Sequence, residues 1–411
     1  MRKSVIVVLA VLATLVLALL GVTAARLSSG GDAVAEHTAA ALPRLPVSPE
    51  DWQGRIDYRL IDRQLTELAG RPEMAGLAVA IVEDGELRFV GTYGVTSKET
   101  GEPVVPGTVF RWASLSKTVT GTLAGQMADA GELDLAAPLG RDTTSLRLPD
   151  GEEATLTLEQ VLSQSTGLTA HAYDDRLEAG EDPATLRRIL ADAPMQCRPG
   201  DCHTYQNVAF DVATEVLGAV ADEPFEQAVE QRLFAPLGMN SAGYGMDTLT
   251  GAKSWARPHQ GDLVRELSQS YWRVPAAAGV SSNIVDLARW MIAEMGENEA
   301  VLSPGALALA HDVRVNTPRP YGGALRAATG DAGYGLGWRT FDYGGHRLQG
   351  HSGAVDGFRA TMLFDPATRT GVVAMWNSNW GFPFRVPFAV LDSYDGRSEV
   401  DWLDTSELDL P

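Results

Sequence analysis

The sequence predicts an α+β fold, a sandwich in which one antiparallel sheet, assembled from both ends of the chain, is flanked by helices and faces an inserted, mostly helical lobe. Two strand patterns at 76–82 and 86–93 are joined at Asp84 and Gly85, a strong signal for a tight hairpin. Near the other end, alternating apolar runs follow one another at 334–341, 346–350, 358–364 and 371–376. The sequence between the two groups lacks such alternation. We expect a binding cleft where the sheet meets the lobe.

The N-terminal segment differs from the rest of the chain. Arg2 and Lys3 precede an uncharged run at 4–25 that ends in small residues, which is typical of an export signal. The run is also long enough to span a bilayer, so residues 1–25 are either a cleaved signal peptide or an N-terminal membrane anchor. In both cases we expect the remaining chain in the periplasm or outside the cell. The stretch at 26–51 contains Ala, Ser, Gly and Pro without periodicity and is predicted to be a linker.

Helical periodicity appears before the first strand and throughout the middle of the chain. An amphipathic helix is predicted between 53 and 71. A second helix is predicted to begin near Ser114 and to end at Gly131, because apolar residues recur at every fourth position from 115 to 127. Further helical candidates lie at 158–164, 183–193, 208–220 and 284–295. We expect one domain at 52–392 and a solvated, acidic C-terminal tail at 393–411.

Composition limits the classes of function. With 45% hydrophobic and 21% charged residues among 411, the chain is typical of a globular protein. Its formal net charge of -20 argues against a nucleic-acid partner, because phosphate binding requires basic patches. The sequence contains no nucleotide-binding loop and no plausible metal cluster, so we expect no cofactor.

The two cysteines favour an oxidising compartment. Cys197 and Cys202 enclose a turn-forming sequence, and a short disulfide loop is expected outside the cytoplasm. A metal site is the competing interpretation. It is weaker, because two thiols with only His203 beside them leave a tetrahedral zinc short of ligands.

Ser114 and Lys117 form a Ser-x-x-Lys motif at the start of the second predicted helix. Residues three apart lie on one face of a helix, so the hydroxyl and the ammonium can meet. Serine is a poor nucleophile until a base takes its proton, and a lysine in a desolvated site can be that base. The first turn of a helix also offers unpaired N–H groups to a developing oxyanion. The motif is a candidate nucleophile and base, although an N-cap serine followed by a surface lysine has the same spacing.

Tyr205 and Asn207 follow the cysteine pair in a Tyr-x-Asn motif. A phenol beside a cation can pass a proton, and a side-chain amide can hold a substrate carbonyl. The alternative is a loop tyrosine before a helix that begins near Val208. In isolation this motif predicts little.

The segment from His351 to Ala354, His-Ser-Gly-Ala, stands at the end of a predicted strand. Gly353 would let a substrate backbone approach the strand edge. The N–H of Ala354 could then serve as an oxyanion donor beside the N–H of Ser114. The alternative is a histidine that closes a hairpin.

Together the motifs resemble a known family. Ser-x-x-Lys, Tyr-x-Asn and His-Ser-Gly, in this order and at these separations, resemble the serine β-lactamases of class C and the related D-alanyl-D-alanine carboxypeptidases and family VIII-type esterases. The resemblance extends over roughly 53–377 and implies the β-lactamase/transpeptidase-like fold. Its further landmarks are the segments 110–114, 161–168, 236–239, 278–282 and 334–338.

The resemblance implies a serine hydrolase that works through an acyl-enzyme. Ser114 would be the nucleophile and Lys117 its proton acceptor. Tyr205 would pass the proton to the leaving group, and Asn207 would orient the substrate. Whether Lys117 or Tyr205 is the general base stays open, because closely coupled groups titrate as a unit.

The same resemblance assigns substrate contacts to His351, Ser352 and Gly353, with the N–H groups of Ser114 and Ala354 as the oxyanion hole. Many class C β-lactamases have lysine where this chain has His351. A lysine is cationic at neutral pH and can hold a substrate carboxylate, whereas histidine has a reference pKa of about 6.5. We therefore expect a D-alanyl peptide or a small ester as substrate, before a β-lactam.

Two rival interpretations differ in class. An α/β-hydrolase is disfavoured, because its nucleophile elbow requires glycine where Ala354 stands and no βαβ pattern surrounds it. The other rival is a penicillin-binding-like sensor or wall-binding module, which acylates without turnover. Its side chains would be the same, so only hydrolysis of a chromogenic ester separates it from an enzyme.

Overall fold

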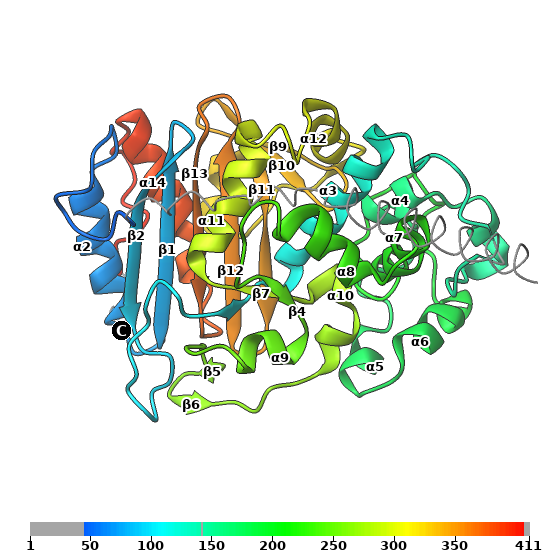
Figure 1. The fold of residues 1–411 in the computed structure, drawn as a ribbon, viewed down its shortest axis with the longest axis horizontal. Coiled ribbons are helices and arrows are strands. Elements are labelled where there is room, and N and C mark those ends of the chain that lie inside the picture. The colour runs from blue at the N-terminus through cyan, green and yellow to red at the C-terminus, as the bar shows by residue number, and fades with distance from the viewer. Residues whose placement is uncertain (1–44, 141–142, 407–411) are drawn as a thin grey trace, which may run out of the picture. The chain divides into compact units, whose positions relative to one another are not determined.

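An eight-stranded antiparallel sheet forms the centre of the structure, a computed structural model that describes residues 45–140 and 143–406 (Figure 1). The strand order is β2-β1-β13-β12-β11-β10-β9-β8, so the N-terminal hairpin is hydrogen-bonded to the last strand of the chain. This order confirms the predicted sheet built from both ends. The strands are β1 (Gly76–Glu83), β2 (Glu86–Gly94), β8 (Val315–Thr317), β9 (Thr329–Tyr334), β10 (Arg339–Tyr343), β11 (His346–Val355), β12 (Phe358–Asp365) and β13 (Thr370–Trp376).

The predicted hairpin is present at Asp84 and Gly85. Both residues have positive φ, 55° and 83°, and Glu83 pairs with Glu86 across the turn. Two left-handed residues give a turn whose twist matches that of the flanking strands. The tight connection explains why β1 and β2 lie next to each other at the edge of the sheet.

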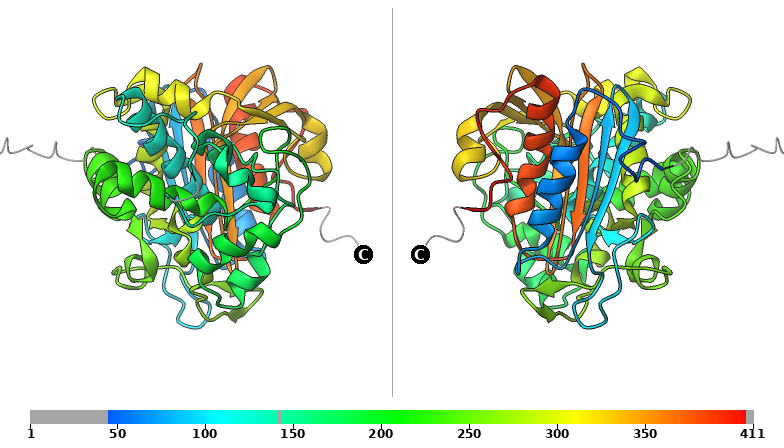
Figure 2. Two further views of the ribbon diagram at one scale, coloured as in Figure 1. Left: turned by 90° about the vertical axis from the view of Figure 1, so that its right-hand side faces the viewer. Right: turned by 90° about the vertical axis from the view of Figure 1, so that its left-hand side faces the viewer.

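Helices cover both faces of the sheet. On one face, residues 77, 79 and 81 of β1 pack in a core with α2 (Tyr58–Ala69) and α14 (Val386–Asp395). Figure 2 shows these two helices, blue and red, side by side over the sheet. On the other face, residues 78, 80 and 82 belong to a larger core that continues into the helical lobe. Since both faces are covered, the central strands are apolar on both sides.

The lobe consists of short helices inserted between the two groups of strands, as predicted. Two small sheets accompany them, with β3 (Phe110–Arg111), β7 (Val280–Ser282) and β4 (Gly243–Tyr244) in one and β5 (His259–Gln260) and β6 (Leu263–Val264) in the other. Strands of two or three residues are too short to show alternation. The helices are α3 (Ser116–Asp129), α4 (Leu158–Leu162), α5 (Asp174–Glu178), α6 (Pro183–Ile189), α7 (Ala213–Ala221), α8 (Phe225–Val229), α9 (Gly245–Thr250), α10 (Pro275–Ala278), α11 (Ile284–Ile292), α12 (Pro304–His311) and α13 (Gly323–Ala328).

Helix α3 is buried on nearly all sides, whereas its sequence predicted a single apolar face. Lobe and sheet elements both press against it, and glycines make the close approach possible. A Cβ on Gly121 would lie 1.5 Å from the carbonyl oxygen of Leu336, and one on Gly337 would lie 2.1 Å from that of Lys117. The helix that follows Ser114 is therefore fixed against the turn between β9 and β10.

The acidic C-terminal segment departs from the prediction. Residues 396–406 do not form a solvated tail, because Trp402 and Leu403 are buried in the core beside α2 and α14. Trp402 Nε1 donates to Asp392 Oδ2 at 2.8 Å, and Arg397 Nε donates to Asp392 Oδ1 at 2.8 Å. Buried apolar area and a partly buried ion pair thus hold a segment whose composition alone suggested solvation.

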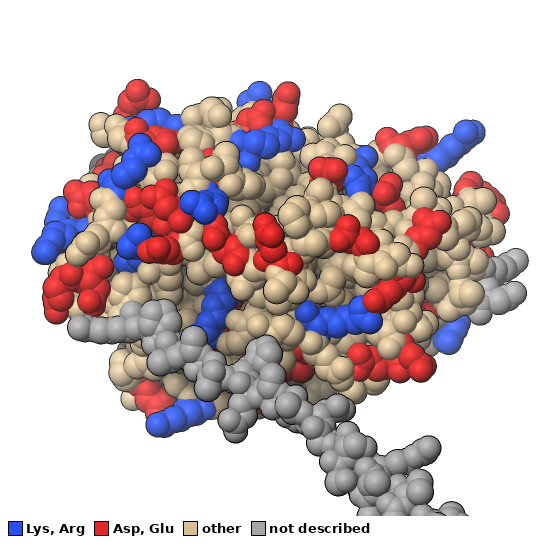
Figure 3. Space-filling model, turned by 45° about the horizontal axis from the view of Figure 1, so that its top comes forward, with Lys and Arg blue, Asp and Glu red and all other residues tan. Residues whose placement is uncertain are grey.

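The predicted signal or anchor at 1–25, most of the predicted linker and residues 407–411 lie outside the described residues. Within the ranges that are described, no helix combines the length and apolarity needed to cross a membrane. On the face seen in Figure 3, acidic side chains are interspersed with Lys and Arg rather than gathered in one patch.

Candidate active site

Ser114 lies on a tight turn between β3 and α3. The turn is the 3-10 helix η1 (Ala113–Leu115), and the Trp112 N–H before it donates to the Val280 carbonyl at 3.0 Å. Ala113 has a φ of +50°, in the left-handed region that non-glycine residues rarely adopt. Ser114 lines a cavity, and in the described part of the chain its hydroxyl has no hydrogen-bond partner. The turn presents a free hydroxyl to the cavity.

Lys117 lies one helical turn after Ser114 and is fully buried. Its Nζ donates to Asn207 Oδ1 at 2.6 Å and to the Ala277 carbonyl at 3.0 Å, and it lies 4.7 Å from the centre of the Tyr205 ring. The two acceptors use two of the bonding directions of Nζ, and the third has no hydrogen-bond partner in the part of the chain that the structure describes.

Tyr205 is held by Gln164, a buried residue that the sequence did not single out. Gln164 Oε1 accepts from the Gln206 N–H at 2.7 Å, and Gln164 Nε2 donates to the Gln206 carbonyl at 3.0 Å. The Gln164 carbonyl accepts from the Thr204 N–H at 2.7 Å. These three bonds fix the backbone on both sides of Tyr205. Across residues 45–140 and 143–406, the Tyr205 hydroxyl has no hydrogen-bond partner.

The cysteine loop supports the same segment. Cys197 and Cys202 form a disulfide, which ends three residues before Tyr205. The loop packs closely on Gly167, where a Cβ would lie 2.4 Å from the Cys197 carbonyl oxygen. The disulfide therefore lies just before the turn that carries Tyr205 and has a structural role there.

The edge of β11 forms the opposite wall. The last pair between β10 and β11 joins Arg339 to Gly350, and within the described ranges no strand pairs with the next β11 residues on that side. Instead, η1 approaches so closely that a Cβ on Gly353 would lie 1.9 Å from the Trp112 carbonyl oxygen. Ser352 and Ala354 line the cavity next to this contact.

These elements enclose a cavity of about 350 Å³. Lys117 is buried and does not line the cavity, but it is bonded to Asn207, which does. The residues that line it are Ser114, His171, Asp174, Tyr205, Asn207, Tyr271, Ala278, Arg339, His351, Ser352, Gly353, Ala354, Val355 and Phe384. The structure thus brings the three sequence motifs together around one space.

The Beta-lactamase family matches residues 61–389, most of the chain. The protein belongs to this family. It is accordingly a serine hydrolase, with relatives of the β-lactamase and penicillin-binding type.

Curated relatives of the family extend over most of the chain. A protein named penicillin-binding protein 4 from Amycolatopsis lactamdurans is 27% identical over 346 residues, which cover 82% of this chain and 87% of the relative. A protein named Beta-lactamase from Escherichia coli K12 is 25% identical, covering 80% and 91%. A solved structure of an octameric penicillin-binding protein homologue from Pyrococcus abyssi is similar with a TM-score of 0.72 at 21% identity, covering 84% of this chain and 78% of that one. The last likeness shows the fold.

His351 of this β-lactamase-family hydrolase is bonded to protein groups through both ring nitrogens. Its Nδ1 lies 2.7 Å from the Ser352 carbonyl, which can only accept, so Nδ1 carries the hydrogen. Its Nε2 lies 2.9 Å from the Tyr334 hydroxyl and accepts from it. Burial, followed by Arg339 and Lys117, lowers the pKa of His351 well below its usual value. Both ring nitrogens are thus bonded to protein groups, and burial disfavours the charged form of the ring.

Arg339 supplies the cation that sequence reasoning missed. It is half-buried in the cavity wall, with its guanidinium 5.6 Å from the Tyr205 ring centre and 5.3 Å from that of Tyr334. Among the described residues it forms no hydrogen bond or ion pair. The available signal was its place directly after the 334–338 landmark.

Two further polar residues, Asp174 at the start of α5 and His171 just before it, were missed because a helix of five residues is too short to show periodicity. Asp174 Oδ2 accepts from Asn207 Nδ2 at 2.7 Å and lies 2.8 Å from His171 Nδ1. Asp174 is buried, whereas the side chain of His171 is 59% exposed at the cavity rim. Over the described parts of the chain, no group of three His, Cys, Asp or Glu residues could hold a metal ion.

Proposed function

We propose that this serine hydrolase is exported and cleaves an amide or ester through an acyl-enzyme on Ser114, with a peptide ending in a D-alanine carboxylate as the favoured substrate class. The observation that carries the proposal is a cation, Arg339, that lies in the same cavity as Ser114 and Tyr205 and has no hydrogen-bond or ion-pair partner among the described residues. A free cation beside a nucleophile is suited to a substrate with a carboxylate near the scissile bond.

The proposed reaction begins with proton transfer from Ser114 to Lys117. The serine oxygen attacks the substrate carbonyl carbon, and the resulting oxyanion is stabilised by the N–H groups of Ser114 and Ala354. When the carbon–nitrogen or carbon–oxygen bond breaks, Tyr205 delivers a proton to the departing group, and Lys117 resupplies Tyr205. Water then attacks the acyl ester by the reverse transfers, which releases the acid and restores the serine.

Lys117 is the base in this proposal because of its hydrogen bonds. Both of its partners are oxygens that only accept at those contacts, so they orient the two N–H groups of a neutral amine. The remaining lone pair is the acceptor for the serine proton. Tyr205, whose hydroxyl is unbonded within the described chain and whose ring lies beside Lys117, has the position of a proton carrier.

In this proposal Arg339, and not His351, holds the substrate carboxylate. A guanidinium presents donors in a planar fork that matches both oxygens of a carboxylate. His351, held neutral between Ser352 and Tyr334, would form part of the wall against which the substrate lies. This arrangement favours carboxylate-ended peptides over neutral esters.

The first test is the intact mass of the full-length protein after exposure to excess benzylpenicillin, with Ser114→Ala in parallel. A penicillin carries both a reactive amide and a carboxylate, so it probes the serine and the cation together. We expect an adduct on the wild type alone, together with release of D-alanine from an acyl-D-alanyl-D-alanine peptide by the wild type.

The other possible outcomes each indicate a different function. Consumption of the drug without an adduct means rapid deacylation and a β-lactamase. Turnover of neutral esters alone contradicts the carboxylate preference and indicates an esterase. A stable adduct without turnover of any peptide or ester contradicts the enzyme and supports a penicillin-binding-like sensor.

A further inference from the structure

We propose that two buried carboxylates, Asp174 and Asp211, are positioning residues that hold the two oxygen acceptors of Lys117. The inference rests on the proposed function, in which the Lys117 amine takes the serine proton. Neither carboxylate contacts Lys117 directly. Each acts through one acceptor, Asp174 through the Asn207 amide and Asp211 through the backbone next to Ala277.

Asp174 decides which way the Asn207 amide faces. A carboxylate only accepts, so the amide nitrogen must face Asp174, at 2.7 Å. The amide oxygen is then on the side of Lys117, 2.6 Å from Nζ. The reverse orientation would place an N–H donor against the Lys117 amine. His171, which lies 2.8 Å from the same carboxylate oxygen, holds Asp174 from the cavity side.

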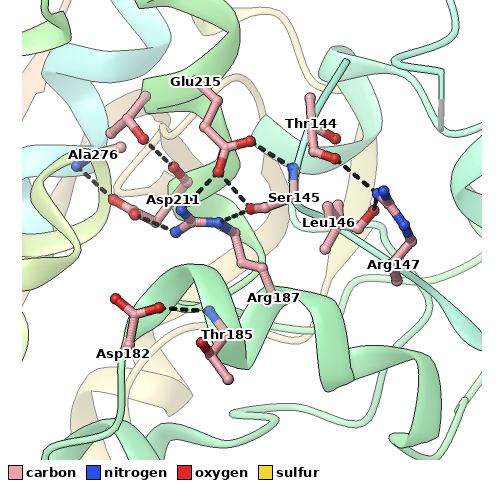
Figure 4. Close-up of polar contacts among 11 residues, drawn as sticks. Thr144, Ser145, Leu146, Arg147, Asp182, Thr185, Arg187, Asp211, Glu215 and Ala276 are labelled. Carbon is pink, nitrogen blue, oxygen red and sulfur yellow. Dashed lines mark hydrogen bonds and ion pairs between the residues drawn. The ribbon is translucent and has the colours of Figure 1, made fainter. Parts of the chain in front are cut away.

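Asp211 fixes the other acceptor. Its Oδ1 accepts from the Ala276 N–H at 3.1 Å, at the start of helix α10 (Figure 4). The carbonyl of Ala276 accepts from Thr120 Oγ1 at 2.8 Å, and the next carbonyl, that of Ala277, accepts from Lys117. Helix α10 is therefore bonded to Asp211 on one side and to α3 on the other.

Asp211 also reaches the first acceptor through its backbone. Its N–H donates to the Asn207 carbonyl at 3.2 Å, in the turn that carries the Asn207 side chain. One residue thus connects both groups that bond to Lys117. This connection was not visible in the sequence, where 208–220 was predicted to be one uninterrupted helix.

A buried arginine anchors Asp211 in the lobe. Arg187 Nη1 donates to Asp211 Oδ2 at 2.7 Å, and its other nitrogens donate to Ser145 Oγ and Glu215 Oε1 at 2.7 and 2.8 Å (Figure 4). Burial raises the pKa of Asp211 to about 8, and Arg187 and the Ala276 N–H oppose this shift. Both contacts of the Asp211 carboxyl group are N–H donors, so each of its oxygens serves as an acceptor.

The test compares leucine and asparagine at each position. Leucine removes every acceptor, whereas asparagine keeps one amide oxygen. The matched control is Asp392, another buried carboxylate, which accepts from Tyr343 and is paired with Arg397 on the far face of the sheet. Variants of Asp392 lose a partly buried ion pair, but Asp392 is not hydrogen-bonded to either acceptor of Lys117.

For Asp174→Leu and Asp211→Leu, we expect acylation by a D-alanyl peptide or benzylpenicillin to slow by about 100-fold or more, with KM changed by about twofold at most. Both asparagine variants should be acylated at least about tenfold faster than the corresponding leucine variants. Asp392→Leu should lower Tm and leave kcat within about twofold. A rise in KM alone, or an equal kcat loss in Asp392→Leu, overturns the proposal.

A spectroscopic measurement tests the positioning role without depending on catalytic activity. The chain has four lysines, Lys3, Lys98, Lys117 and Lys253, so 13Cε-lysine labelling gives a simple spectrum that Lys117→Arg assigns. We expect the Lys117 signal to move in Asp174→Asn and Asp211→Asn and to stay in Asp392→Asn. An unmoved signal in the first two overturns the positioning role. Failure of the proposed function would appear instead as a wild type that neither acylates nor turns over.

Discussion

At the scale of single residues, the site is defined by which polar groups already have partners. His351 and Lys117 have hydrogen-bond partners within the protein, whereas the hydroxyls of Ser114 and Tyr205 and the guanidinium of Arg339 have no hydrogen-bond or ion-pair partner in the described chain. Buried or half-buried polar groups without partners are costly to maintain. We therefore assign substrate contacts to the unpartnered groups.

The first prediction concerns Arg339. Replacing it with alanine removes the cation that the proposed carboxylate needs, so kcat/KM for an acyl-D-alanyl-D-alanine peptide should fall about 10- to 100-fold. For a neutral ester it should change little. The control is Arg347→Ala, which removes an exposed arginine paired with Asp342. Equal losses for both substrates in Arg339→Ala would contradict the role.

The second prediction concerns the neutrality of His351. Burial, Arg339 and Lys117 lower its pKa well below the ordinary value of about 6.5, so its charge does not change between about pH 6 and pH 8. The ratio of kcat/KM for a carboxylate peptide to that for a neutral ester should be constant across this range. A ratio that falls as pH rises through about 6.5 would contradict this neutrality and indicate that a cationic His351 holds the carboxylate.

At the scale of helices and strands, the features that could be predicted were those marked by a periodic pattern or by a motif. The hairpin at Asp84 and Gly85 and the strands β12 and β13 are long enough to alternate, and their positions were predicted correctly. The predicted strand 334–341 was wrong, because it spans the turn between β9 and β10, and β11 continues beyond its predicted end at 350 to Val355. The two-residue strand β3 and its partner β7 were not predicted, although they anchor η1. Asp174 and Gln164 were missed as polar partners, because only the folded chain brings them to Asn207 and Tyr205.

The third prediction concerns the contact between β11 and η1. Gly353→Ala adds a Cβ that would lie 1.9 Å from the Trp112 carbonyl oxygen, so the strand edge or the serine turn must move. Because acyl transfer needs both, we expect kcat/KM to fall about 100-fold or more. Gly322→Ala is the control, since a Cβ there has no atom within 4 Å and its φ is -130°. Full activity in Gly353→Ala would show that this close contact is dispensable.

At the scale of the whole molecule, the site depends on segments far apart in sequence. The nucleophile lies at 114, the tyrosine at 205 and the arginine at 339, and β1 pairs with β13 across the entire domain. Such long-range pairing is slow to form and leaves no part of the site complete on its own. The sequence motifs predicted which residues meet, because their order resembles a family. The partners that set their orientation could not be predicted without the fold.

The last prediction concerns acid stability. Burial, with a contribution from Arg339, lowers the pKa of His203 to about 4. An unfolded histidine binds a proton near pH 6.5, so between about pH 6.5 and 4 the unfolded state holds more protons than the folded state. Stability from this group is therefore complete above about pH 6.5 and is lost as pH falls, by up to about 3 kcal/mol.

Chemical denaturation at about pH 7 and pH 5 measures this loss in the free energy of unfolding. His203→Gln removes the titrating ring, so the difference between the two pH values should shrink relative to wild type, by about 1 to 2 kcal/mol. His351, whose pKa is also lowered, retains its own share of the loss in the variant. An unchanged difference in His203→Gln would mean that His203 takes up a proton in the folded state as readily as in the unfolded chain.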